Sequence, residues 1–107
     1  MSTAPKSQTL TLAEMASYQD AAVVSRQITK ADAGNVTLFA FDKDQGLSEH
    51  TAPFDALVHI LEGEAQVTIS GKPFELKAGD AIIMPANEPH ALYAAQRFKM
   101  LLTMIRA

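Results

Sequence analysis

The sequence predicts an all-β fold, and three observations support that class. Short stretches rich in β-branched and aromatic residues recur along most of the 107-residue chain. Glycine, proline, asparagine and aspartate separate these stretches at short intervals, as is typical of turns. No helical pattern lies between them that could carry a parallel crossover connection. We therefore expect an antiparallel sandwich or barrel.

The first element expected along the chain is a short peripheral helix within residues 10–18. Leu12, Met15 and Ala16 have the spacing of one helix face, and Thr11 precedes them as a candidate cap. After residue 22 the sequence pattern changes to alternating and β-branched residues, so no further helix is expected.

The strands are expected to form one domain. Residues 1–21 would be an N-terminal extension and residues 22–107 a single barrel domain, because no linker, low-complexity tract or internal repeat divides them. Strands are predicted at residues 23–29, 35–41, 56–61, 65–69, 73–76, 81–84, 90–94 and 98–105.

Composition excludes several classes of function. The net charge of -3 is scattered along the chain, so no basic face is available for nucleic acid or an anionic membrane. The absence of cysteine excludes disulfides, thiolate catalysis and cysteine-based zinc sites. No apolar run approaches the roughly 20 residues that a bilayer requires. We expect a soluble, cytoplasmic protein.

The last predicted strand, residues 98–105, is apolar at nearly every position rather than at alternate ones. Both of its faces should therefore be covered. A second subunit is the plain explanation, so we expect a homodimer, although an internal position between two sheets would explain the same run.

Two spaced patterns lie around two of the histidines. The first begins at His50 and ends at Gly63, and the second begins at Gly79, passes through Pro85 and ends at His90. Their order and spacing resemble the two motifs of the cupin superfamily. The resemblance covers roughly residues 36–105 and implies a small, dimeric double-stranded β-helix, or jelly-roll barrel, with a pocket between its sheets.

The resemblance also implies where a metal would bind, and the ligand set is incomplete there. In metal-binding cupins the first motif supplies two histidines and a glutamate, and the second supplies a histidine. These positions correspond to His50, Ala52, Ala56 and His90, and alanine donates nothing. Asn87 replaces a motif glycine, which is a mild change because asparagine enters the left-handed backbone region.

A divalent ion such as zinc, nickel, manganese or iron would thus depend on His50 and His90 with help from elsewhere. Asp55 is the nearest candidate, because it lies in a turn-like segment where strand parity does not fix its direction. His59 is a weaker candidate, since parity directs it away from His50. We interpret His59 as a packed or interface ring.

We expect His50 and His90 to meet in a ligand pocket, because the two motifs converge in the fold that they imply. A neutral imidazole pair accepts and donates hydrogen bonds near neutral pH, which suits a small molecule with one polar end. Met84 and Met100 are expected in the pocket wall, and the alternative is that they only fill gaps in the core. The predicted pocket residues are His50, His90, Ala52, Ala56, Met84 and Met100.

Two functions are compatible with these residues. The first is a small-molecule-binding or sensing protein without turnover, and the second is a metal-dependent enzyme, an oxygenase or isomerase of a small substrate. No nucleophile elbow or phosphate-binding loop is present. The two alanines at ligand positions favour the first.

Overall fold

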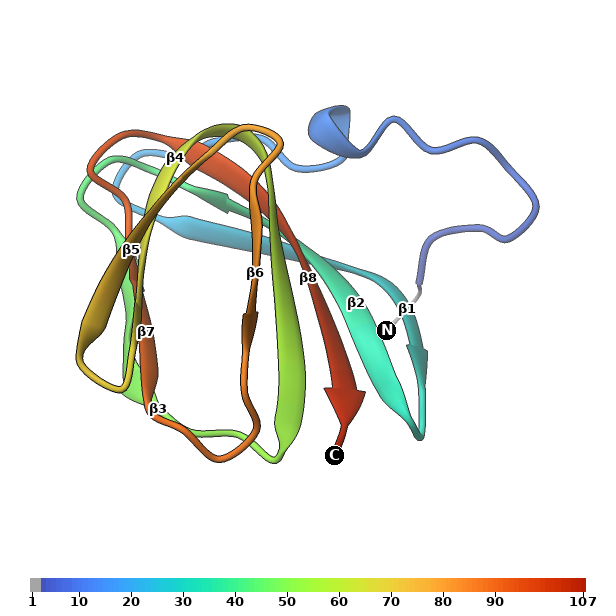
Figure 1. Ribbon diagram of the computed structural model, residues 1–107. Helices are drawn as coiled ribbons and strands as arrows, with labels where there is room; N and C mark the ends of the chain where they lie inside the picture. The colour runs from blue at the N-terminus through green and yellow to red at the C-terminus, as the bar shows by residue number, and fades with distance from the viewer. Residues whose placement is uncertain (1–2) are drawn as a thin grey trace.

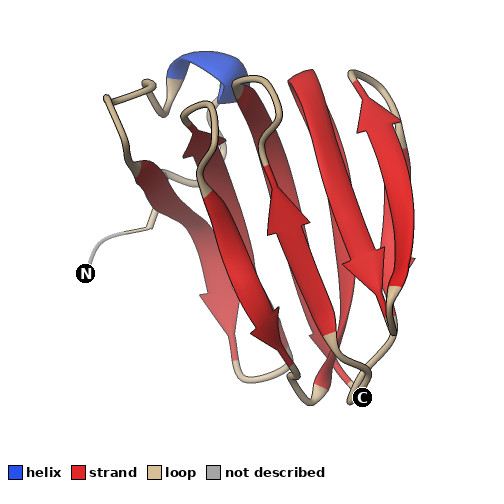
Figure 2. Cartoon of the chain, turned by 90° about the vertical axis from the view of Figure 1, so that its left-hand side faces the viewer, coloured by secondary structure: helices blue, strands red, loops and turns tan. Residues whose placement is uncertain are grey.

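The computed structural model describes residues 3–107, and its fold is all-β (Figure 1). Over these residues there is a single 3-10 turn, η1 (Leu12–Glu14), outside the array of strands (Figure 2). Every strand pairing is antiparallel. The strands are β1 (Val23–Ala31), β2 (Gly34–Phe41), β3 (Gly46–His50), β4 (Phe54–Ile69), β5 (Lys72–Lys77), β6 (Ala81–Met84), β7 (His90–Tyr93) and β8 (Phe98–Arg106).

The strands form two facing sheets that share β4. The first sheet has the order β1-β2-β8-β4-β6, and the second has the order β5-β4-β7-β3. The beginning of β4 pairs with β8 and β6, whereas its end pairs with β5 and β7. This long strand therefore closes the double-stranded β-helix along one side (Figure 1).

A bend inside β4 lies where the sequence predicts a turn between two strands. The pairing of β4 with β8 shifts between Ile60 and Glu62, so the strand bends without ending. Gly63 has φ +79°, and a Cβ atom there would lie 1.9 Å from the carbonyl oxygen of Arg97. The predicted turn was wrong because glycine here permits a close approach to β8 rather than a reversal of the chain.

A tight hairpin turn joins β4 to β5. Ser70 and Gly71 both have positive φ, at 49° and 80°. Two consecutive residues of this kind make the primed turn whose twist matches antiparallel strands.

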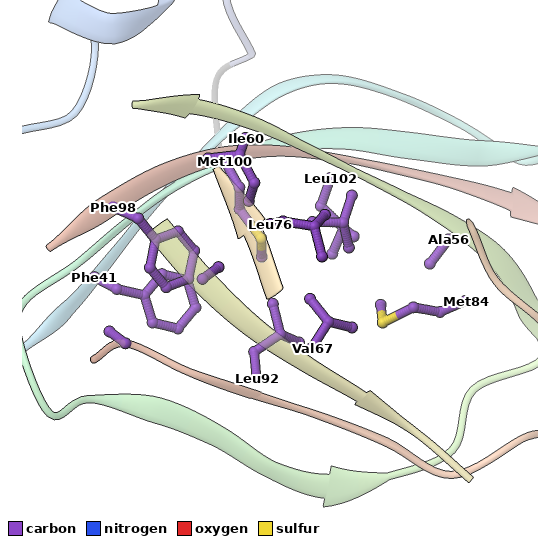
Figure 3. Close-up of a cluster of buried hydrophobic side chains, with 13 residues drawn as sticks. Phe41, Ala56, Ile60, Val67, Leu76, Met84, Leu92, Phe98, Met100 and Leu102 are labelled. Carbon is purple, nitrogen blue, oxygen red and sulfur yellow. The ribbon is translucent and has the colours of Figure 1, made fainter. Parts of the chain in front are cut away.

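The inner faces of the two sheets enclose the main core. The rings of Phe41 and Phe98 stack with centroids 4.4 Å apart at one end of this cluster, and Ala56 and Met84 lie at the other end (Figure 3). The buried members are Phe41, Ala56, Val58, Ile60, Ala65, Val67, Leu76, Met84, Leu92, Ala94, Phe98, Met100 and Leu102.

The N-terminal segment lies on the outer face of the first sheet (Figure 1). The predicted helix was wrong: only η1 forms, and Thr11 makes no capping hydrogen bond with its side chain. The apolar residues that suggested a helix instead cover the sheet, where Leu12 and Met15 pack against a second buried cluster that includes Leu38 and Ala40. Packing against a preformed surface has overridden a weak local preference.

This segment is fixed to the barrel by polar contacts as well. The Tyr18 hydroxyl donates to Glu62 Oε2 at 2.6 Å. The charged groups of Arg97 and Lys99 lie 5.1 and 5.0 Å from the centre of the Tyr18 ring. The segment thus covers part of the second face of β8, which accounts for part of the apolar run in that strand. The homodimer stays a prediction.

Among residues 3–107 the structure contains no apolar helix of the length that a membrane span requires.

Candidate functional site

The site is formed where β3 ends and β7 begins. His50 is the last residue of β3 and His90 the first of β7, and the two are register partners. Partners in an antiparallel pair project from the same face, so the two rings meet. Their Nε2 atoms lie 3.2 Å apart and the ring planes cross at 72°.

Backbone carbonyls hold both rings at Nδ1, the ring nitrogen that is not in contact with the other histidine. His50 Nδ1 lies 2.7 Å from the carbonyl oxygen of Ser48, and His90 Nδ1 lies 3.1 Å from that of Glu88. A carbonyl oxygen only accepts, so each Nδ1 carries the proton and donates it. In a neutral ring this leaves Nε2 as a bare acceptor. The site therefore presents two acceptors that face each other.

The two histidines differ in their environment. His90 is 4% exposed, whereas His50 is exposed. Burial, followed by the neighbouring His50, lowers the pKa of His90, and the hydrogen bond to the Glu88 carbonyl opposes this shift. At neutral pH the His90 ring is therefore held in its neutral form.

A cavity of about 210 Å³ opens beside the histidine pair. Four predicted pocket residues line it, namely His50, His90, Ala56 and Met84. The other lining residues, which the sequence prediction missed, are apolar: Phe39, Leu47, Leu92, Leu102 and Met104. The polar end of this pocket is thus the two imidazoles, and the remaining wall is hydrocarbon and thioether.

Two predicted pocket residues are not among those that line the cavity. Met100 is fully buried and pairs with Ile60 and Phe39. Ala52 lies in the connection between β3 and β4, where its carbonyl accepts a 2.8 Å hydrogen bond from the amide of Asn87. Met104 replaces Met100 as the lining methionine of β8, because the register of β8 places it opposite Ala56.

The loop before His90 holds its geometry through Asn87. This residue has φ +66°, so asparagine takes the left-handed conformation that the motif resemblance led us to expect. The amide of Asn87 ties this loop to the connection that follows His50. This hydrogen bond joins the loop after His50 to the loop before His90, so it restrains the backbone near both rings.

The two candidate supplementary donors point elsewhere. Asp55 and His59 alternate with Ala56 and Val58, so they lie on the outer face of β4. Asp55 Oδ1 accepts a 2.9 Å hydrogen bond from the amide of Ala86. Within residues 3–107 no group of three histidine, cysteine, aspartate or glutamate side chains is placed to hold a metal ion. Catalytic zinc sites use three protein ligands, so the residues present do not fit a resident catalytic metal.

Fold and site together define a class of protein: a small double-stranded β-helix with a histidine from each of two motifs in a pocket between its sheets. A profile of the cupin domain matches residues 37–105. The chain belongs to the cupin family.

Solved structures agree with this assignment. A conserved protein of unknown function from Streptococcus pyogenes is 34% identical, over 100% of this chain and 96% of that one, with a TM-score of 0.91. A cupin superfamily protein from Desulfitobacterium hafniense is 29% identical, over 99% and 97% of the two chains, with a TM-score of 0.90. A cupin 2 conserved barrel domain protein from Leptotrichia buccalis is 39% identical, over 91% of this chain and 47% of that one, with a TM-score of 0.88. No curated protein matches the chain.

Proposed function

We propose that this cupin binds a small organic molecule between its two sheets and does not transform it. The observation that carries this proposal is the composition of the pocket. At two positions where metal-binding cupins have ligands the chain has Ala52 and Ala56, and Ala56 lines the cavity beside His50 and His90.

Size and lining support a small, mostly apolar ligand. The cavity of about 210 Å³ is below the roughly 300–1,000 Å³ of sites for drug-sized molecules. Leu102, Met84 and Phe39 offer apolar contact, and methionine adapts to irregular shapes. Only the two imidazoles can orient a polar group, so one polar end and one apolar body describe the ligand.

A metal-dependent enzyme is the second candidate, and one observation favours it. Two imidazoles that share a tetrahedral ion at about 2.0–2.1 Å have nitrogens about 3.3 Å apart, and the Nε2 atoms here lie 3.2 Å apart. Hydrogen bonds from Nδ1 to backbone carbonyls are also common for metal-bound histidines. The second candidate needs a third ligand that no described side chain supplies.

Binding of a set of single-ring fragments to metal-free protein tests the proposal. Amide chemical shifts are recorded by NMR in the presence of EDTA. We expect fragments to shift amides of β3, β6 and β7, and Ala56→Phe to abolish the shifts by filling the cavity.

A matched control lies on the same strand. Leu57 faces outward opposite Ile83 and is 38% exposed, so Leu57→Phe adds bulk to β4 without entering the cavity. We expect this variant to bind fragments as the parent does. Absence of any binding, or equal binding by the two variants, would contradict the proposed site.

A further inference from the structure

The histidine pair is one proton short of a satisfied hydrogen-bond network. Two neutral imidazoles carry two ring protons, and both are used by the carbonyls of Ser48 and Glu88. The Nε2 atoms of His50 and His90 are nevertheless in contact at 3.2 Å. Two lone pairs at that distance repel each other, so a hydrogen-bond donor beside the pair would stabilise it.

The pocket wall does not supply that donor. Apart from the two histidines, the residues that line the cavity have side chains without O–H or N–H groups. An added charge on the His90 ring would be buried, because this ring is only 4% exposed and no carboxylate lines the cavity. Inside the cavity, therefore, only an occupant can bring the donor.

Charge decides between the donors that an occupant can bring. An ammonium group would enter a pocket with no carboxylate among its lining residues, which leaves its charge uncompensated. A carboxylate only accepts hydrogen bonds, as the two Nε2 atoms do, so it would add a third acceptor. A neutral hydroxyl group donates a hydrogen bond and brings no charge.

The geometry points to selection of neutral alcohols or phenols, whose hydroxyl donates to the Nε2 atoms of His50 and His90 while the apolar body fills the cavity. This inference rests on the proposed function, and it adds the chemical class of the ligand. A site arranged to pair with a hydroxyl group discriminates against analogues that lack it, because its own polar atoms would stay unpaired.

Three probes of similar shape test this selection: benzyl alcohol, toluene and benzoate, titrated separately by NMR at pH 7.5 with EDTA. We expect benzyl alcohol to bind about two- to twelve-fold more tightly than toluene, as one net hydrogen bond provides. Benzoate should bind more weakly than either. In a His50→Leu variant the preference for benzyl alcohol over toluene should fall toward one, while His59→Leu, on the outer face, should keep it.

A second readout requires no ligand and no variant. Nitrogen-15 shifts of the histidine rings report their tautomers, and we expect the Nδ1–H form for both His50 and His90 in the parent protein. Rings in the Nε2–H form would overturn the inference even if fragments bind.

The probe results separate this inference from the function on which it rests. Tighter binding of benzoate, or equal binding of benzyl alcohol and toluene, would overturn the selection while the binding function stands. If no probe binds and the fragment set also fails, the proposed function is wrong and the selection falls with it.

Discussion

Gly63→Ala should destabilise the protein far more than the same change at Gly71. Both glycines have left-handed φ values, +79° and +80°, so both substitutions strain the backbone by about 1–2 kcal/mol. At Gly71 nothing lies within 4 Å of the added Cβ atom. At Gly63 the atom would lie 1.9 Å from the carbonyl oxygen of Arg97 and 2.8 Å from Cα of Phe98.

The extra cost at Gly63 comes from separating two strands. Contacts of a Cβ atom below 3.0 Å are essentially never seen, so β4 and β8 must move apart by at least about 1 Å. That movement loosens the pairing of Gly63 with Phe98, whose ring is fully buried against Phe41. Lost hydrogen bonds and packing should bring the total to about 3 kcal/mol or more.

Urea denaturation followed by circular dichroism measures this difference. We expect the free energy of unfolding to fall by about 1–2 kcal/mol for Gly71→Ala and by at least about 3 kcal/mol for Gly63→Ala. Losses that agree within about 0.5 kcal/mol would refute the interpretation that β4 bends here because β8 passes so close.

Three further predictions concern pH, the N-terminal segment and assembly. The pKa of His90 in the folded protein lies below its usual value of 6.5. As the pH falls, the unfolded chain therefore binds the proton at a higher pH than the folded protein does. The free energy of unfolding should decrease between pH 6.5 and the folded pKa. Urea denaturation at several pH values checks this, and a His90→Phe variant that keeps the same slope would contradict it. Tyr18→Phe removes the hydrogen bond to Glu62 and should cost about 1 kcal/mol, with faster hydrogen exchange in the N-terminal segment; unchanged exchange would count against that attachment. Light scattering should give a dimer mass, and a monomer mass at micromolar concentration would reject the homodimer.

Motif spacing in the sequence predicted that two distant histidines meet in the fold. The two motifs identified His50 and His90, which the structure brings into contact. Strand parity directed His59 outward, as the structure has it, but parity was set aside for Asp55 because that residue looked like part of a turn. In the structure β4 has already begun at Phe54, so parity holds for Asp55 as well.

The walls of the pocket depend on pairings that the sequence does not specify. Strand β3 was missed because its residues, Gly46–His50, are mostly polar and exposed, and it is ordered by its partner β7. The choice between Met100 and Met104 follows from the register of β8 against β4. Register results from the packing of the whole barrel and not from local preference.

In the N-terminal segment, too, packing against the barrel decided a feature that the local sequence did not predict correctly. Its apolar residues were assigned to one face of a helix, but they pack on the outer surface of the first sheet without forming one. Short isolated helices are marginal, so a nearby apolar surface decides the outcome.

The metal content of protein purified without a histidine tag tests the central claim most directly. Protein incubated with zinc, nickel, manganese or iron(II) and then dialysed is analysed beside the His50→Ala/His90→Ala and Ala56→Glu variants. The latter places a carboxylate in the same cavity as a third donor, so it should retain metal and shows that the assay detects a completed site. We expect the parent protein to retain far less than one ion per chain; near-stoichiometric metal that disappears in the double variant would contradict the metal-free binding function.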